Sequence, residues 1–93
     1  MIGGFRCEQT RGIFEGRVSI EFPQTMQKTA KRRLDILAAA TSLQDIGMLP
    51  GNQLEALKGK RKGQHSIRVN DQWRICFSWR ENKAYEVEIL DYH

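Results

Sequence analysis

The residues best suited to chemistry in this sequence are three consecutive side chains at positions 91–93. They are Asp91, Tyr92 and His93. Histidine changes its protonation near neutral pH, so His93 is a candidate proton donor or acceptor, and Asp91 could accept a proton or orient a neighbour. The ring of Tyr92 could stack on an unpaired base, a favoured way of holding single-stranded RNA.

Positive charge is concentrated ahead of these three residues. The 93-residue chain has 15 basic and 11 acidic side chains and a formal charge of +4. Positions 58–80 hold seven basic side chains and one acid, so this segment carries +6 and the remainder of the chain −2. The seven are Lys58, Lys60, Arg61, Lys62, Arg68, Arg74 and Arg80. Such a segment indicates an anionic partner, most often nucleic acid, although Lys58–Lys62 could equally be solvated surface.

Hydrophobic spacing predicts helices in the first half of the chain. Apolar residues from Met26 to Leu37 recur with helical spacing, which indicates an amphipathic helix from about Pro23 to Thr41. Shorter elements are expected around it, namely a strand at Ile2–Phe5, a helix at Glu8–Gly16 and a helical turn ending at Asp45–Gly47.

The second half changes to a strand pattern. Apolar and polar residues alternate over positions 65–69, 73–79 and 85–89, as in half-buried antiparallel strands. Helices followed by such a meander predict an α+β fold, in which an antiparallel sheet has helices packed on one face. The length favours a single domain over residues 1–93.

The loop between the first two strands sets their register. A three-residue loop at Asn70–Gln72 keeps the apolar side chains of both strands on one face, whereas a two-residue loop mixes the faces. With three residues, Ile67 pairs with Ile75 and Arg68 lies opposite Arg74. The sequence therefore predicts two neighbouring arginines on the polar face of the sheet.

Two opposed arginines repel each other, at a cost of about 0.2–1 kcal/mol, which a bound phosphate would offset. Alternatively, both guanidinium groups extend into solvent, or Glu86 and Glu88 neutralise them. The same pattern in the next hairpin pairs Trp79 with Tyr85, Phe77 with Val87, Ile75 with Ile89 and Arg74 with Leu90. This places residues 91–93 beside the arginine pair.

Together these groups fit the cleavage of RNA by its own ribose 2′-hydroxyl. The arginines would stabilise the charged phosphorane, and His93 and Asp91 would move protons. That reaction requires no metal, and His65 and His93 are the only histidines in the sequence. We therefore expect neither a metal site nor a cofactor.

Composition and cysteine usage indicate an ordinary soluble protein. With 40% hydrophobic and 28% charged residues, the chain does not have the composition of a disordered or disulfide-rich protein. Cys7 and Cys76 are expected to be reduced thiols in the cytoplasm. The longest apolar run, Ile36–Ala40, is too short to span a membrane, and the first residues lack the apolar stretch of a secretory signal.

Three segments carry a likeness to a known family. They are Leu57-Lys58-Gly59, the run from Gly63 to Ile75, and Asp91-Tyr92-His93. From Leu54 to His93, and more loosely from Met1, the sequence resembles the HigB group of RelE-superfamily toxins. The resemblance implies a microbial ribonuclease fold and cleavage of mRNA on the translating ribosome. It also implies a helix-turn-helix antitoxin of the HigA type, with operator DNA contacted only through that antitoxin.

The resemblance also implies roles for individual residues. Catalytic roles fall on Arg74, Asp91, Tyr92 and His93, and RNA or ribosome contacts on the basic loop of Lys58, Lys60, Arg61 and Lys62. Arg68 is expected to join these contacts because the register places it opposite Arg74. One departure is Glu55, where some members of the group have a histidine. Glu55 could act as a base, but it could not donate a proton unless its pKa were strongly raised, so its participation stays open.

Two other functions are compatible with the sequence. A non-catalytic inhibitor could bind RNA or the ribosome through the same basic face without cleaving. A transcriptional regulator could use the basic helix face of Lys28, Lys31 and Arg32, although no helix-turn-helix pattern accompanies it.

Overall fold

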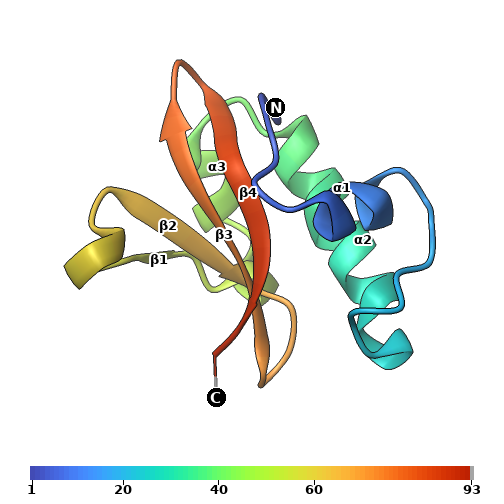
Figure 1. The fold of residues 1–93 in the computed structure, drawn as a ribbon. Helices are drawn as coiled ribbons and strands as arrows, with labels where there is room; N and C mark the ends of the chain where they lie inside the picture. Colours follow the sequence, from blue (N-terminus) through green and yellow to red (C-terminus); the bar gives the residue numbers. More distant parts are fainter. Residues whose placement is uncertain (93) are drawn as a thin grey trace.

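The computed structural model describes residues 1–92, in which helices precede a four-stranded antiparallel sheet (Figure 1). The helical elements are α1 (Glu8–Phe14), α2 (Gln24–Ala39), α3 (Leu43–Gly47), η1 (Pro50–Asn52) and η2 (Gly59–Arg61). The strands are β1 (Glu55–Ala56), β2 (Gln64–Arg68), β3 (Trp73–Arg80) and β4 (Lys83–Asp91), and they lie in this order in the sheet. The predicted α+β fold is confirmed.

The helix α2 covers one face of the sheet because its apolar residues share one side. Met26, Ala30, Leu34 and Leu37 are at most 1% exposed and pack with residues of α1, α3 and the sheet. Pro23 is the N-cap residue, so the helix begins at Gln24, one residue after the predicted start. The helix ends at Ala39, two residues before the predicted end.

The N-terminal segment differs in part from its prediction. Helix α1 is present, but Ile2 and Phe5 form two isolated parallel bridges to β4 instead of a continuous strand. Gly3 lies against the ring of Tyr85, where a Cβ atom would be 2.4 Å from Cε1. A larger residue at this position would therefore have to displace the Tyr85 ring.

The register between β2 and β3 is confirmed. Ile67 pairs with Ile75, and Arg68 pairs with Arg74. Asn70 stabilises the three-residue loop, since its Oδ1 accepts hydrogen bonds from the backbone N–H groups of Gln72 and Trp73.

The register between β3 and β4 is confirmed only near the end of β4. Arg74 pairs with Leu90 and Ile75 with Ile89, as predicted, but Trp79 pairs with Ala84 and not with Tyr85. Two features explain the difference. Glu81 and Asn82 form a two-residue turn with positive φ angles, and a β-bulge opposite Phe77 places one extra residue in β4. Glu86 lies at this bulge with φ 56°.

Candidate active site

The candidate site lies on the outer face of the sheet, opposite the face that α2 covers. Arg74 is at its centre and is only 8% exposed. Its Nε donates to Ser66 Oγ at 2.8 Å, and its Nη2 donates to the backbone carbonyl of Gln53. Both acceptors come from neighbouring segments, since Ser66 is on β2 and Gln53 follows η1. These bonds fix the plane of the guanidinium group.

An acidic side chain from β1 lies beside Arg74. Glu55 Oε1 is 3.8 Å from Arg74 Nη1, and the Glu55 side chain is 59% exposed. The sheet places Glu55 opposite Ser66, which itself bonds Arg74. The structure thus places an exposed carboxylate, which can accept a proton, beside an immobilised guanidinium group, which carries a positive charge.

Arg68 and Arg74 are opposed in the backbone, but their side chains have different partners. Arg68 forms an ion pair with Asp71 in the β2–β3 loop, and Arg74 pairs with Glu55. The alternative in which Glu86 and Glu88 neutralise this pair is therefore wrong. Arg68 stands at the edge of the site and is partly exposed.

The end of β4 is tied to the β2–β3 loop. The backbone N–H of Tyr92 donates to the Gln72 carbonyl at 2.6 Å, and Gln72 Nε2 donates to Asp91 Oδ2 at 3.0 Å. Asp91 also pairs with Trp73 in the sheet. These contacts place Asp91 and Tyr92 beside β3, and the pairing with Trp73 puts Asp91 on the helix-covered face of the sheet, opposite to Arg74. The third predicted residue, His93, lies outside the described residues.

The hydroxyl of Tyr92 reaches back to the outer face of the sheet. It is 3.9 Å from the thiol of Cys76, while 43% of the Tyr92 residue is exposed. Burial raises the pKa of the Tyr92 phenol and the neighbouring Cys76 raises it further, while Arg61 and Arg74 act against this shift. The phenol is therefore neutral at physiological pH and can donate a hydrogen bond, and its exposed ring can stack.

Cys76 is a buried thiol of this face and not a reactive one. It is fully buried, and burial raises its pKa, which disfavours the nucleophilic thiolate. Both Cys7 and Cys76 are free thiols in the structure.

The basic loop between β1 and β2 contains two kinds of residue. Arg61 is attached to the sheet, since its Nη1 donates to Gln64 Oε1 at 2.9 Å and to Glu88 Oε2 at 3.1 Å. Glu88 is also 3.9 Å from Arg6, so two arginines neutralise it. The lysines Lys58, Lys60 and Lys62 are exposed and form no ion pair within residues 1–92. The lysines are therefore available to an anionic partner.

Sequence reasoning missed several residues that hold the site together. Gln53 and Gln72 act partly through backbone carbonyls, which leave no sequence signal. Ser66 could have been found, because the predicted register places it two residues from Arg68 on the same polar face. Glu88 had been named as a possible partner of the arginines, and the confirmed part of the β3–β4 register pairs it with Cys76.

Two absences concern residues 1–92 alone. No three histidine, cysteine or acidic side chains there gather as a metal site would require. None of the helices combines the length and the apolar character needed to cross a membrane.

Comparisons with known proteins point to one toxin family. Residues 7–93 match a family described as the RelE-like toxin of type II toxin-antitoxin system HigB. The chain is 41% identical to Toxin HigB-1 of Vibrio cholerae over 71 residues, which are 76% of this chain and 74% of that protein. It is 34% identical to Endoribonuclease HigB of Proteus vulgaris over 95 residues, which span all of both chains.

The fold has a counterpart among solved structures. A chain of the YoeB-YefM complex from Staphylococcus aureus superposes with a TM-score of 0.54 over all of this chain and 98% of that one. The two sequences are 17% identical, so this likeness concerns the fold alone.

Proposed function

Because the chain belongs to the HigB-like family of RelE-like toxins in type II toxin-antitoxin systems, we propose that it is an endoribonuclease that cleaves mRNA on the translating ribosome. Its relative in Proteus vulgaris is named an endoribonuclease. The observation that carries the proposal is the Arg74 guanidinium, held rigid on the outer sheet face beside the carboxylate of Glu55, where its charge also acts on the phenol of Tyr92.

The proposed reaction is an attack by the ribose 2′-hydroxyl on the adjacent phosphorus. The 2′-oxygen forms a bond to phosphorus as its proton passes to a base. The bond from phosphorus to the 5′-oxygen of the next nucleotide then breaks, and that oxygen receives a proton from an acid. The products are a 2′,3′-cyclic phosphate and a 5′-hydroxyl, so no metal or cofactor is needed.

Each step has a candidate residue. Glu55 is the base, since it lies beside Arg74 and is open to solvent, and Asp91 orients the acid. His93 is the acid. Arg74 stabilises the negative charge that develops on the phosphate oxygens, and fixed donors do this without reorganisation during the reaction. Tyr92 stacks on a neighbouring base.

The same proposal covers the partners. Residues 1–93 act as one toxin domain in the cytoplasm, and a HigA-type helix-turn-helix antitoxin neutralises it. Operator DNA is contacted only through that antitoxin. The family is one of toxin-antitoxin systems, and the similar fold of YoeB occurs in a complex with YefM, which supports an antitoxin partner.

The test uses the purified chain with ribosomes that carry a defined mRNA. Primer extension should find new 5′ ends inside codons, and a 2′-deoxy nucleotide at the cleaved position should abolish them. Ribosomes that stall uniformly without new ends would instead favour the alternative, a non-catalytic inhibitor that binds RNA or the ribosome.

Tyr92 provides a first prediction about this site. Tyr92→Phe should keep cleavage within a few-fold, because the ring remains, while Tyr92→Ala should weaken substrate binding by roughly tenfold or more through lost stacking. Since the Tyr92 pKa is raised, the phenol stays protonated, and both enzymes should show the same pH profile between pH 6 and 9. Steady-state kinetics across this range check the result. Equal binding by the parent and Tyr92→Ala would contradict the stacking role.

The exposed lysines of the basic loop provide a second prediction. Replacing Lys58, Lys60 and Lys62 with alanine should reduce the salt dependence of ribosome or RNA binding, by about two in the slope of log K against log salt concentration. The fold should be unaffected, because these side chains are exposed. Binding measured at several salt concentrations checks this. Lys83→Ala, at the far hairpin, is the control, and an unchanged slope in the triple variant would exclude these lysines from the interface.

A further inference from the structure

Glu88 is a carboxylate of the outer sheet face that the proposed reaction does not use. Its side chain is only 12% exposed, and it pairs with Cys76 across the sheet, so it lies on the same face as Arg74. Its Oε2 accepts from Arg61 Nη1 at 3.1 Å and is 3.9 Å from Arg6 Nε. The two guanidinium groups offset the cost of burying this charge. Glu88 is therefore a fixed anchor for the cations around it.

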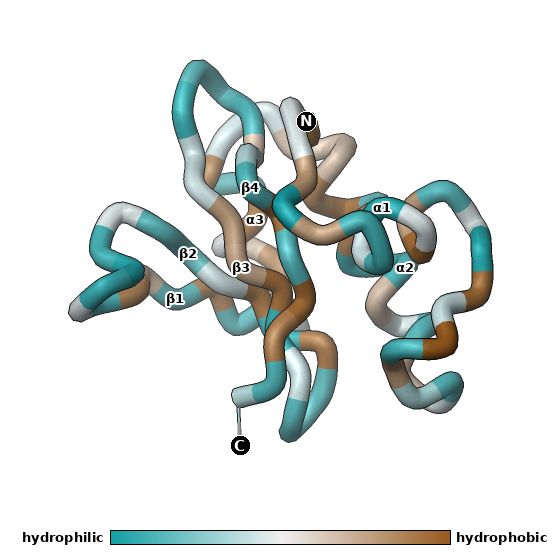
Figure 2. The backbone as a smooth tube through the Cα atoms, in the orientation of Figure 1, coloured by the Kyte–Doolittle hydropathy of each residue, from teal (hydrophilic) through white to brown (hydrophobic). Residues whose placement is uncertain are grey.

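Arg61 belongs to the loop between β1 and β2, but its guanidinium group is attached to the sheet. The loop is mostly hydrophilic (Figure 2), and its lysines Lys60 and Lys62 are exposed on either side of Arg61. The Nη1 of Arg61 donates to Gln64 Oε1 at 2.9 Å as well as to Glu88. Gln64 is on β2 and Glu88 is on β4, so the two bonds fix Arg61 across β3, the strand between them.

Arg61 and Arg74 are held on opposite sides of Cys76. Ser66, which accepts from Arg74, pairs with Cys76 from β2, and Glu88 pairs with it from β4. Since neighbouring strands are about 4.7–4.9 Å apart, these two anchors are roughly 10 Å apart across the face. The Tyr92 hydroxyl is 3.9 Å from the Cys76 thiol between them, and the charges of both arginines act on this phenol. Two fixed cations therefore flank the ring that is proposed to stack on a base.

Arg61 keeps hydrogen-bond donors for a ligand. Both of its bonds within residues 1–92 are made by Nη1, so the N–H groups of Nη2 and Nε can still donate. Its side chain is 32% exposed. Glu88 supplies one negative charge to two arginines, Arg6 and Arg61, so the three together remain positive. A phosphate is the anion that a planar guanidinium group binds well.

We propose that Arg61 is a second phosphate-binding group of the site and that Glu88 is the residue that positions it. Arg74 acts on the phosphate that is cleaved, and Arg61 binds a neighbouring phosphate of the same RNA strand. Anchors roughly 10 Å apart suit two phosphates better than one. The inference rests on the proposed function for the identity of the ligand, a single-stranded RNA.

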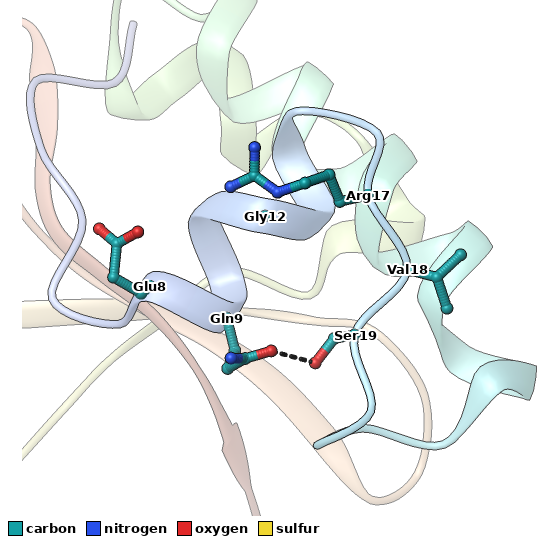
Figure 3. A pocket seen from close by; sticks show the side chains of 6 residues that line it. All are labelled: Glu8, Gln9, Gly12, Arg17, Val18 and Ser19. Atoms are coloured by element: carbon teal, nitrogen blue, oxygen red, sulfur yellow. Dashed lines mark hydrogen bonds between the residues drawn. The ribbon is translucent and has the colours of Figure 1, made fainter.

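A hollow on the helical side of the molecule suits a phosphate less well. It lies between α1 and the loop that follows, has a volume of about 280 Å³, and has Glu8 as well as Arg17 in its wall (Figure 3). Arg17 also pairs with Glu15 at 2.6 Å. Acidic side chains thus balance the cation of this hollow, whereas Glu88 is shared between two arginines.

The experiment measures single-turnover cleavage of a defined mRNA on ribosomes at increasing concentrations of the full-length toxin. Glu88→Ala should raise the concentration for half-maximal cleavage about tenfold and leave the rate at saturation within threefold. This sign is specific, because removal of an acid from an RNA-binding face otherwise strengthens binding. Arg61→Ala should show the same loss, and the double variant should be no weaker than Arg61→Ala alone. Glu88→Gln, which keeps an acceptor for Arg61, should recover most of the affinity.

Two matched controls separate positioning from net charge. Glu86→Ala removes an exposed carboxylate of the same strand, which bonds Gln64 Nε2 at 3.4 Å, and should not raise the half-maximal concentration by more than threefold. Arg80→Ala removes a positive charge at the far hairpin, where Arg80 lies 4.1 Å from the centre of the Tyr85 ring. It should raise the half-maximal concentration by less than threefold.

Thermal melting checks that each variant is folded, and Arg61→Ala with Glu88→Gln carries the test if Glu88→Ala does not fold. A folded Glu88→Ala that binds as tightly as the parent would overturn the positioning role, as would a double variant tenfold weaker than Arg61→Ala. Unchanged binding by Arg61→Ala would remove the second phosphate contact. Affinity for a single-stranded RNA oligonucleotide is measured in parallel. A parent that does not cleave, while Arg61→Ala loses tenfold in this affinity, would contradict the proposed function and leave the second phosphate contact standing.

Discussion

Replacement of Arg74 with alanine should lower RNA cleavage by about 10²–10³-fold. Arg74 is the one guanidinium group held by both Ser66 and Gln53, so it presents its charge in a fixed position. The change should reduce the catalytic rate more than the affinity for the programmed ribosome. Single-turnover cleavage at saturating toxin separates these two quantities.

Loss of Arg74 also affects the fold. Its removal leaves acceptors at Ser66 and Gln53 without a donor, which costs about 1–3 kcal/mol. Thermal melting must therefore accompany the kinetics, and Arg74→Lys, which keeps the positive charge, tests the need for the fork-shaped group. Arg68→Ala is the matched control, because Arg68 pairs with the exposed Asp71, and it should retain cleavage within about tenfold. A folded Arg74→Ala that cleaves like the parent would remove this residue from the mechanism.

Replacement of Glu55 with glutamine should lower the cleavage rate by about 10²–10⁴-fold, if Glu55 is the base. Glutamine has the same shape but cannot take the 2′-hydroxyl proton. Stability should change little, because the pair with Arg74 is long and Glu55 is 59% exposed. The rate should fall without a comparable change in substrate affinity.

Two other substitutions make this result specific. Glu86→Gln alters another exposed carboxylate and should cleave like the parent. Glu55→His introduces the histidine that some members of the HigB group have at this position. Since histidine is also a base, this variant should cleave faster than Glu55→Gln. Cleavage by Glu55→Gln at the parental rate would exclude Glu55 as the base.

The helices and the β2–β3 register could be predicted because local pattern decides them. The apolar residues of α2 recur with a spacing that only a helix places on one side. The loop Asn70–Gln72 has the length that keeps Ile67 and Ile75 on one face of the sheet. The opposition of Arg68 and Arg74 followed directly from this register. These features depend only on residues close in sequence or joined by a short turn.

The remaining features depend on contacts that no local pattern records. Tyr85, Val87 and Ile89 alternate as in a regular strand, and this alternation hides the bulge that changes the phase of β4. The burial of Arg74 depends on Ser66 and on a backbone carbonyl after η1. The neighbouring strand β1 is two residues long, too short to show alternation, so the approach of Glu55 could not be foreseen.

The extra residue at Glu86 determines where β4 can tolerate a change in its length. Between the turn at Asn82 and the end of the strand, Ala84 and Val87 both face the core because the bulge lies between them. Deleting Glu86 would remove the bulge and leave Ala84 and Val87 two residues apart, both still facing the core, whereas a deletion between Glu88 and Asp91 would turn every later residue of the strand to the opposite side of the sheet. Functional variants of this protein should therefore accept the loss of a residue at the bulge far more readily than a loss in the regular part of β4.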